Sequence, residues 1–395
     1  MRQLLLTAAL SLCACTDTFH SVGFYNRVDT TNAGNKAVLA LGTGDLNGDG
    51  RADVILADDA NEVNVLFSKG DGNFATGVSY PIENLGNQPR SIVIGDLNND
   101  GRADVVVGNI NQNTVQVFIN QGDGRLVALQ PTSLQVNCKP SFLVLHDMTG
   151  DGRLDLVIGC GSPNEVHILK NQGAGPAPGQ PLSFGGMYIH KWTTATGQSG
   201  SEPAILGFAV GELNGDNTPD IAVATMSDLR ILNSPRESVI DYQVSMPLTV
   251  PTMAVALGDV TGNGVTDISA LTEGKSVQVF EYATGGAYNQ VVAYQNLGIN
   301  GRTTTPVLKV ADLSSDGKSD LLLTLNNPTE IKVAVSRSET GIVTAPVTLS
   351  YQYPASDLSI CDGCVSLGDL NGDGKLDLVL HNNGSKISVL LNASH

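Results

Sequence analysis

Oxygen-bearing side chains recur at a fixed spacing in seven nine-residue segments of this 395-residue chain. Acidic residues occupy the first and ninth positions, Asn, Thr or Ser the third, Asp or Asn the fifth, and usually Gly the sixth. In the first segment these residues are Asp45, Asn47, Asp49, Gly50 and Asp53. Carboxylate, amide and hydroxyl oxygens crowded into one turn are ligands that Ca²⁺ prefers, and the seventh-position carbonyl completes the shell. The spacing therefore predicts a calcium site in each segment.

We expect up to seven Ca²⁺ ions, each bound by positions one, three, five, seven and nine of one segment. The expected ligands are Asp45, Asn47, Asp49, Arg51, Asp53, Asp96, Asn98, Asp100, Arg102, Asp104, Asp147, Thr149, Asp151, Arg153, Asp155, Glu212, Asn214, Asp216, Thr218, Asp220, Asp259, Thr261, Asn263, Val265, Asp267, Asp312, Ser314, Asp316, Lys318, Asp320, Asp369, Asn371, Asp373, Lys375 and Asp377. The fourth segment departs at Glu212, Asn217 and Pro219. The fifth has Asn263 at its fifth position, keeps two carboxylates, and is expected to be the weakest site.

Two other interpretations of these segments are less favoured. Asp, Asn and Gly also dominate metal-free turns, so a single copy is compatible with an ordinary hairpin. The segment occurs seven times, and position three carries a side-chain oxygen in every copy. This regularity favours a metal site over an ordinary turn. An EF-hand needs a bidentate Glu at position twelve and flanking helices, and the sequence has neither.

Short runs rich in β-branched residues flank each segment and predict strands. The second unit supplies "SIVIGDL", "ADVVVGN", "TVQVFIN" and a weaker strand around residues 127–134. Short strands in units of about 50 residues are typical of a β-propeller. The chain ends on the strand "KISVLLN" and begins with an unpaired strand, "GFYNRVD". We expect the N-terminal strand to complete the last blade, which removes an exposed edge.

The segments "GDLNGDGRADVILADDANEVNVLFSKGDGNF", "GDLNNDGRADVVVGNINQNTVQVFINQGDG" and "GDLNGDGKLDLVLHNNGSKISVLLN" resemble the FG-GAP/VCBS repeats of integrin alpha-subunit head domains and bacterial surface proteins. The resemblance covers essentially everything after residue 24. It implies an all-β fold, a seven-bladed β-propeller over residues 24–395, with Ca²⁺ in the hairpin between the first and second strands of each blade.

The acidity of the chain is largely explained by these segments. The formal net charge is −17, and 20 of the 39 acidic residues stand at expected ligand positions. Seven Ca²⁺ ions would bring that charge to −3. With no basic patch in the sequence, nucleic-acid binding is not expected.

The N-terminus has the pattern of an export signal. Arg2 precedes the apolar run "LLLTAALSL", and the following Leu12-Cys13-Ala14-Cys15 resembles the lipobox of bacterial lipoproteins. We expect residues 1–14 to be a signal peptide, Cys15 the lipidated residue and residues 15–23 a tether. The protein would then be an outer-membrane lipoprotein of a bacterial cell envelope, facing the periplasm or the surface, with the lipid as its only membrane contact. An ordinary secretory signal, or lipidation at Cys13, is the alternative.

The remaining four cysteines are expected to form disulfides, because an exported protein meets an oxidising compartment. Cys138 precedes the first strand of the third unit and Cys160 ends the second, so antiparallel pairing brings them together. Cys361 and Cys364 form "CDGC", which we interpret as a local disulfide. A redox motif would need a following helix, and a shared zinc site would join cysteines of different blades.

No catalytic constellation is present, so we expect a monomeric scaffold that binds a protein or glycan ligand and is not an enzyme. The six histidines fall at unrelated positions, and no Gly-x-Ser-x-Gly or His-Glu-x-x-His occurs. Tyr188, His190 and Trp192 are candidate ligand-binding residues, either as an aromatic platform or as side chains packed between blades. A lyase-like carbohydrate-active enzyme is the alternative function.

Overall fold

The computed structural model describes residues 24–31, 36–75, 77–83, 88–130, 133–174, 182–191, 204–233, 242–246, 251–273, 276–283, 287–294, 307–326, 329–334, 348–352, 365–382 and 384–393. All seven nine-residue segments lie within these ranges. The N-terminal signal residues, including Cys15, lie outside them, and so do Trp192, Cys361 and Cys364.

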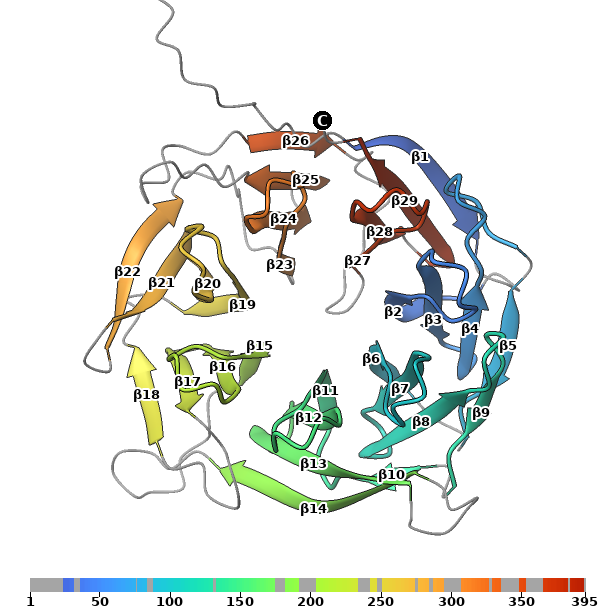
Figure 1. The fold of residues 1–395 in the computed structure, drawn as a ribbon, viewed down its shortest axis with the longest axis horizontal. Coiled ribbons are helices and arrows are strands. Elements are labelled where there is room, and N and C mark those ends of the chain that lie inside the picture. The colour runs from blue at the N-terminus through green and yellow to red at the C-terminus, as the bar shows by residue number, and fades with distance from the viewer. Residues whose placement is uncertain are drawn as a thin grey trace, which may run out of the picture.

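The described residues form an all-β β-propeller, and their strands lie in seven sheets around a central axis (Figure 1). Sheet 1 contains β2 (Val38–Gly44), β3 (Asp53–Asp58), β4 (Glu62–Leu66) and β5 (Val78–Pro81). Sheet 2 contains β6 (Pro89–Gly95), β7 (Asp104–Asn109), β8 (Thr114–Asn120) and the short β9 (Leu126–Ala128) and β10 (Leu134–Gln135), which both pair with β8. Sheet 3 contains β11 (Pro140–His146), β12 (Asp155–Cys160), β13 (Glu165–Ala174) and β14 (Leu182–Lys191).

Sheet 4 contains β15 (Ile205–Gly211), β16 (Asp220–Thr225), β17 (Leu229–Asn233) and β18 (Tyr242–Met246). Sheet 5 contains β19 (Thr252–Gly258), β20 (Asp267–Thr272), β21 (Val277–Ala283) and β22 (Ala287–Tyr294). Sheet 6 contains β23 (Val307–Ala311), β24 (Asp320–Asn326), β25 (Thr329–Ala334) and β26 (Thr348–Gln352). Sheet 7 contains β27 (Val365–Gly368), β28 (Asp377–Asn382), β29 (Lys386–Asn392) and the N-terminal β1 (Phe24–Thr31).

The N-terminal strand is the fourth strand of sheet 7. β1 runs antiparallel to β29, from the pair Phe24 and Asn392 to the pair Thr31 and Lys386. A β-bulge falls between Tyr25 and Val28. The backbone groups on that side of β29 are therefore paired.

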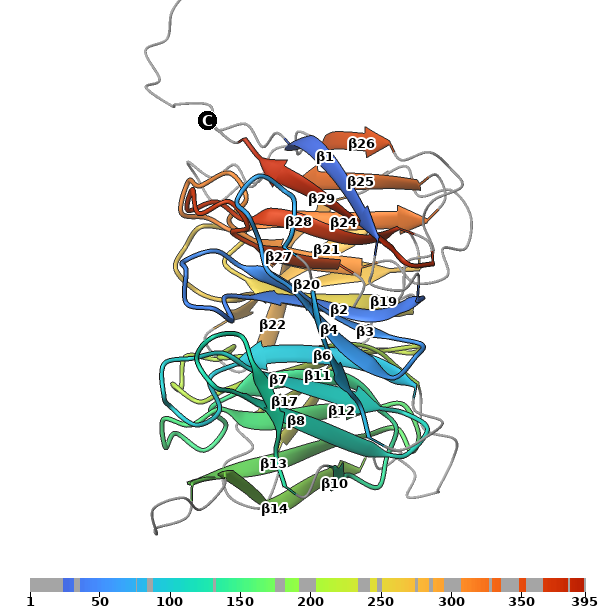
Figure 2. The same cartoon turned by 90° about the vertical axis from the view of Figure 1, so that its right-hand side faces the viewer.

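Each nine-residue segment is the hairpin between the first and second strands of a sheet. Every second strand begins at the ninth-position Asp, and every first strand ends one residue before the first-position acid. In the side view these hairpins emerge on one side of the ring (Figure 2). The repeat therefore gathers its acidic loops, called loops 1 to 7 here, on one face of the molecule.

The core consists of seven hydrophobic clusters, each built from two neighbouring sheets. Between sheets 7 and 1, for example, Val379 and Ile387 pack with Val54 and Leu56, all fully buried. The second strands have their apolar side chains buried on both faces, which explains their continuous runs of Val, Ile and Leu. No helix in the described part of the chain has the length and apolarity needed to cross a bilayer.

Candidate metal centres

The first-position acid organises each loop by accepting backbone amides. Asp45 Oδ1 accepts the amides of Gly48 at 2.7 Å and Asp49 at 3.2 Å, and Oδ2 accepts that of Gly50 at 2.9 Å. The equivalent carboxylates accept amides of their own turns in the same way: Asp96, Asp147, Asp259, Asp312 and Asp369. Each turn thus folds around one carboxylate.

The third and fifth side chains share that turn. Asn47 Oδ1 accepts the Asp49 amide at 2.9 Å, and Asp49 Oδ1 accepts the Arg51 amide at 3.0 Å. Asn47 Nδ2 donates to Asp49 Oδ2 at 3.2 Å, which places the two side chains side by side. Loops 2 and 7 repeat this arrangement with Asn98 and Asp100 and with Asn371 and Asp373. Three of the five expected ligands in a loop are therefore neighbours.

The sixth position requires a left-handed backbone. Gly50 has a φ of 82°, which glycine adopts without the clash of a Cβ atom. Asn217, its counterpart in loop 4, has a φ of 60°. Asn is the residue that tolerates this conformation best after Gly, so Asn217 can stand where the other loops have Gly.

The ninth-position Asp lies beneath the loop and is fully buried. Asp53 Oδ2 accepts the Leu46 amide at 3.0 Å, and Oδ1 accepts the Ser68 amide from the end of β4, also at 3.0 Å. Burial raises the pKa of Asp53 to about 6, the two amides oppose that shift, and the charges of Asp49 and Asp45 reinforce it. Burial likewise raises the pKa of the equivalent Asp104, Asp155, Asp267 and Asp377. A bound cation would relieve this accumulation of negative charge.

Arginine at the seventh position neutralises part of the charge in three loops. Arg51 Nη2 lies 2.5 Å from Asp49 Oδ2, and Arg102 pairs with Asp100 at the same distance. Arg153 pairs with Asp151 in loop 3. Partly exposed ion pairs of this kind contribute about 0 to 1 kcal/mol. A divalent ion can therefore replace the guanidinium at small cost.

The donor set of the loops fits Ca²⁺. Three buried oxygens at expected ligand positions have no hydrogen-bond partner: Thr149 Oγ1, Ser314 Oγ and Asp267 Oδ1. A buried polar atom left unpaired costs about 1 to 3 kcal/mol, and coordination to a hard cation would remove that cost. All expected ligand atoms are oxygens, as this ion requires.

Loop 4 keeps the same organisation with a longer acid. Glu212 Oε1 accepts the amides of Asn214 at 2.9 Å and Gly215 at 2.5 Å. Thr218 donates both its amide and its hydroxyl to Asp216 Oδ1. The Glu212 carboxylate thus also accepts backbone amides of its own turn. Its donors lie two and three residues further on, whereas those of Asp45 lie three, four and five residues further on.

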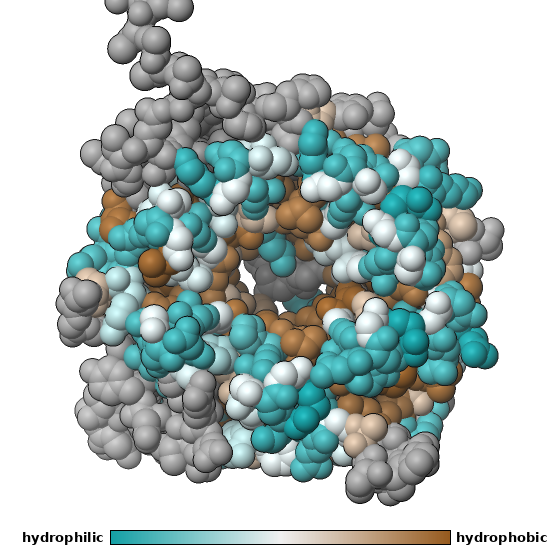
Figure 3. Space-filling model, in the orientation of Figure 1, coloured by the Kyte–Doolittle hydropathy of each residue, from teal (hydrophilic) through white to brown (hydrophobic). Residues whose placement is uncertain are grey.

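A cavity of about 410 Å³ lies on the axis of the ring and is lined by the first strands. Figure 3 shows hydrophobic side chains around the central opening, surrounded by the hydrophilic loop face. The lining residues are mainly apolar, and the charged ones among them are Arg90 and Lys309. No histidine, tyrosine or carboxylate is among these residues.

Of the aromatic candidates, Tyr188 and His190 lie on β14. Tyr188 packs against the cluster between sheets 3 and 4, which includes Val166 and Ile221. Burial lowers the pKa of His190, and the nearby charge of Arg230 lowers it further. Tyr188 therefore contributes to packing between sheets, which is one of the two roles considered for it.

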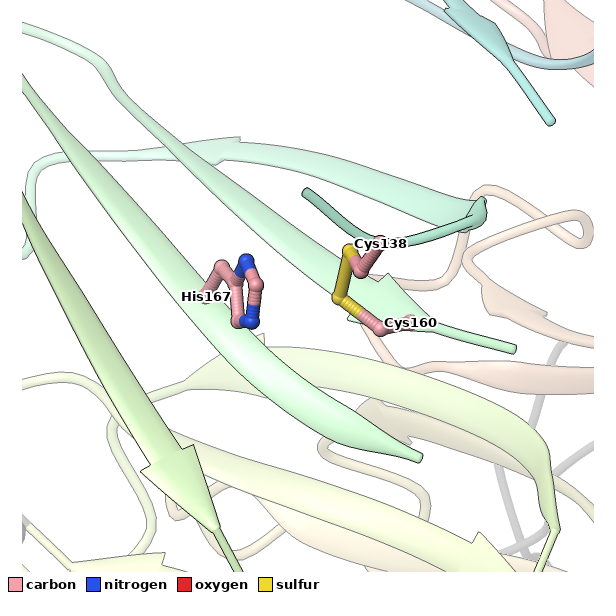
Figure 4. A group of neighbouring side chains, drawn as sticks. All are labelled: Cys138, Cys160 and His167. Atoms are coloured by element: carbon pink, nitrogen blue, oxygen red, sulfur yellow. A yellow bond between two sulfur atoms is a disulfide. The ribbon is translucent and has the colours of Figure 1, made fainter. Parts of the chain in front are cut away.

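The cysteines of sheet 3 are joined to one another. Cys138 and Cys160 form a disulfide, with an S–S distance of 2.03 Å (Figure 4). The fully buried His167 lies beside it, with Nδ1 3.0 Å from Val136 O and Nε2 2.9 Å from Glu165 Oε2. Because both sulfurs are used in the disulfide, this group is a covalent link and a hydrogen-bonded histidine, and not a set of metal ligands.

Sequence reasoning missed two features of these loops. Polar residues near the ends of third strands, such as Asn120, reach the loop of the preceding sheet, where Nδ2 donates to Leu46 O at 2.8 Å. Glu281 on β21 reaches into loop 5, where it contacts Thr261 and Asn263. A comparison of the repeats aligned at the third strand would have pointed to both.

Comparison with known proteins identifies the repeat. The FG-GAP-like repeat family matches residues 45–107, 96–158 and 147–223. A comparison with curated protein sequences gives no match.

Solved structures share the fold at low sequence identity. The structure of BBS1N in complex with ARL6DN covers 93% of this chain and 96% of its own, with 13% identity and a TM-score of 0.57. An Agrocybe aegerita lectin, described as recognising non-reducing terminal N-acetylglucosamine, covers 81% and 82%, with 19% identity and a TM-score of 0.54. Chaetomium thermophilum Raptor covers 90% of this chain and 29% of its own, with 10% identity and a TM-score of 0.52. The motifs, the sheets and these matches agree that residues 45–223 contain FG-GAP-like repeats and that the described residues are arranged as a β-propeller.

Proposed function

We propose that this protein is a calcium-binding recognition scaffold of the bacterial cell envelope. In this proposal the seven sheets are seven blades of a ring closed by β1, and Ca²⁺ occupies the loops between first and second strands. The observation that supports this proposal is the difference in side-chain polarity between the loops and the cavity on the axis. Acidic side chains gather within the loops, whereas the axial cavity is lined mainly by apolar residues.

Calcium would have a structural role, because it would stabilise the loops. Each ion would hold two or three carboxylates of one turn together, because its charge removes their mutual repulsion. The ninth-position ligand is also the first residue of a core strand, so an ion bound there would join the loop to the sheet. The rigid loops would then present a fixed surface to a partner.

The face opposite these loops is the one we assign to the ligand. It is built from short polar turns between second and third strands, such as residues 58–62, where Asp58 Oδ1 accepts the amides of Ala60 and Glu62. Recognition residues commonly stand on loops held by a rigid scaffold. The similarity in fold to a lectin supports a glycan as one ligand class, and a protein is the other.

The envelope location follows from the N-terminal sequence alone. Leu12-Cys13-Ala14-Cys15 after an apolar run is the pattern that supports lipidation at Cys15. The lipid would then be the only membrane anchor, and the propeller would act as a monomer beyond it.

Binding assays test the scaffold function. The purified chain, lacking residues 1–14 and with Cys15→Ser, would be applied to glycan arrays and to envelope extracts in Ca²⁺ and in EDTA. We expect binding that requires Ca²⁺, with no change in the bound molecule. Turnover of a glycan that is abolished by a substitution at the axis, such as Arg90→Ala or Lys309→Ala, would replace this proposal with an enzyme.

A further inference from the structure

We propose that Glu281, on β21, is the third carboxylate ligand of the metal in loop 5. The loop itself offers the carboxylates of Asp259 and Asp267, because Asn263 stands where the other six loops have Asp. The inference rests on the proposal that these loops bind Ca²⁺. It changes the expectation that loop 5 is the weakest site.

Glu281 contacts two expected ligands of the loop directly. Its Oε1 accepts a hydrogen bond from Thr261 Oγ1 at 2.8 Å and another from Asn263 Nδ2 at 2.6 Å. These are the third-position and fifth-position side chains. Glu281 therefore places a carboxylate beside Asn263, the position at which the loop lacks one.

A buried, unpaired oxygen lies in the same loop. Asp267 is fully buried, and its Oδ2 accepts the amides of Val260 at 2.8 Å and Thr261 at 2.9 Å. Its Oδ1 has no hydrogen-bond partner. In sheets 1, 2, 3 and 7 that oxygen accepts an amide from the end of the third strand, donated by Ser68, Asn120, Asn171 and Asn392. Loop 5 thus keeps an unpaired acceptor where loops 1, 2, 3 and 7 have a hydrogen bond, and this oxygen can coordinate a cation without losing a bond.

The register of the third strand shows that this position reaches the loop. Phe280 pairs with Ile268, the residue after the ninth-position Asp, and Glu281 follows Phe280. The residues at the same register in other sheets are Phe67, Ile119, Lys170, Asn233 and Leu391. Lys170 Nζ lies 3.8 Å from Oδ2 of Asp151, the fifth-position acid of loop 3. Among the sheets compared, sheet 5 has Asn at the fifth position of its loop, and sheet 5 also has an acid, Glu281, at this register.

Charge distinguishes a ligand from a simple structural contact. Glu281 lies within hydrogen-bonding distance of Thr261 and Asn263 in a loop that already carries the carboxylates of Asp259 and Asp267, so without a cation its negative charge adds to theirs. With a divalent cation, the same charge becomes favourable. Glu281 should therefore destabilise the metal-free protein and stabilise the metal-bound one.

The test measures Ca²⁺ binding to the full propeller by equilibrium dialysis and calorimetry. Glu281→Gln keeps the size of the side chain and one oxygen that can accept both hydrogen bonds, and removes the negative charge. The matched control is Glu273→Gln, an exposed acid in the turn that follows β20. The rescue is Asn263→Asp combined with Glu281→Gln, which moves the third carboxylate back into the loop.

We expect Glu281→Gln to bind one Ca²⁺ fewer than the natural protein, or to bind that ion about tenfold more weakly. The control should bind as the natural protein does, and the double variant should recover the lost ion. Unchanged stoichiometry and affinity in Glu281→Gln would overturn the ligand role while leaving the other loops intact. A natural protein that binds no Ca²⁺ at all would overturn the proposed function, and this inference with it.

Melting temperatures provide a second readout that a structural role would not give. In EDTA, Glu281→Gln should melt at the same temperature as the natural protein or higher, because one repulsion is removed. In Ca²⁺ it should melt lower. If Glu281→Gln has a lower melting temperature than the natural protein in both EDTA and Ca²⁺, Glu281 stabilises the fold through its hydrogen bonds and is not a metal ligand.

Discussion

The hydroxyl of Ser68 donates a 2.6 Å hydrogen bond to the backbone carbonyl of Leu370, across a sequence separation of 302 residues. Ser68 follows β4 in sheet 1, and Leu370 is the second residue of loop 7. The bond is buried, and it joins the first sheet to the last. It lies beside a backbone bond of 2.7 Å between the Ala52 amide and the Asp369 carbonyl.

The same contact recurs around the ring with asparagine as the donor. Nδ2 of Asn120, Asn171 and Asn392 donates to the carbonyls of Leu46, Leu97 and Leu313, the second residues of the preceding loops, at 2.7 to 2.9 Å. Each amide also donates to a carbonyl of its own sheet. We call Ser68 and these three asparagines the latch residues, because each donates a hydrogen bond to the acidic loop of the neighbouring sheet.

Removing a latch residue should destabilise the fold. Asn120→Ala leaves the buried carbonyl of Leu46 and the partly buried carbonyl of Ala103 without this donor, and a lost buried partner costs about 1 to 3 kcal/mol. Urea unfolding of the purified propeller measures the change. The exposed neighbour Gln121 is the control, and Gln121→Ala should stay within about 0.5 kcal/mol of the natural protein. Equal stability of the two variants would contradict the latch.

Calcium should raise the melting temperature of the propeller. Each ion that binds only the folded state adds about 2.7 kcal/mol at a hundred times its dissociation constant. Scanning calorimetry in EDTA and in millimolar Ca²⁺ should therefore give midpoints many degrees apart. Identical midpoints would remove the metal assignment from all seven loops.

In EDTA, stability should fall as the pH rises from about 4 to about 6. Burial raises the pKa of Asp53, Asp104 and Asp377 from 3.8 to about 6 in the folded protein. The folded state therefore binds these protons more tightly than the unfolded state, and that contribution is present below the unfolded pKa and lost as pH passes the folded one. Urea midpoints measured across this range test the slope, and Asp53→Asn should reduce it. A midpoint that rises with pH in EDTA would count against the buried carboxylates.

Cys15→Ser should release the protein from the membrane. A lipid on Cys15 would be the proposed anchor, so its loss should move the protein into the soluble fraction after cell lysis. Membrane fractionation with immunodetection measures the change, and Cys13→Ser should leave the protein anchored. Mass spectrometry that finds an unmodified N-terminus beyond Cys15 would rule out the lipoprotein.

Local spacing was sufficient to predict the loops. The order of oxygens from Asp45 to Asp53 predicts the hairpin, and the structure begins β3 at Asp53 as that order requires. Asn217 at a glycine position follows from backbone sterics alone. These features depend on residues within nine positions of one another, which is why sequence reasoning reached them.

Contacts between elements could not be predicted in the same way. Asn120 and Leu46 are 74 residues apart, and an asparagine after a strand has the composition of an ordinary turn. Glu281 is separated from Asn263 by 18 residues, so a count of carboxylates within the loop omits it. The role of each depends on the register between strands, which composition does not specify.

The latch residues are not present at every junction. At the position equivalent to Asn120, two residues beyond the pairing of Phe118 with Val105, sheet 5 has Tyr282, whose side chain has no amide to donate. The junction between sheets 4 and 5 is instead filled by the Tyr288 ring, which packs against the cluster there. In hydrogen-exchange terms, this junction should open before the junctions that have a latch residue, so that amides of β16 and β20 exchange before their counterparts β3 and β7.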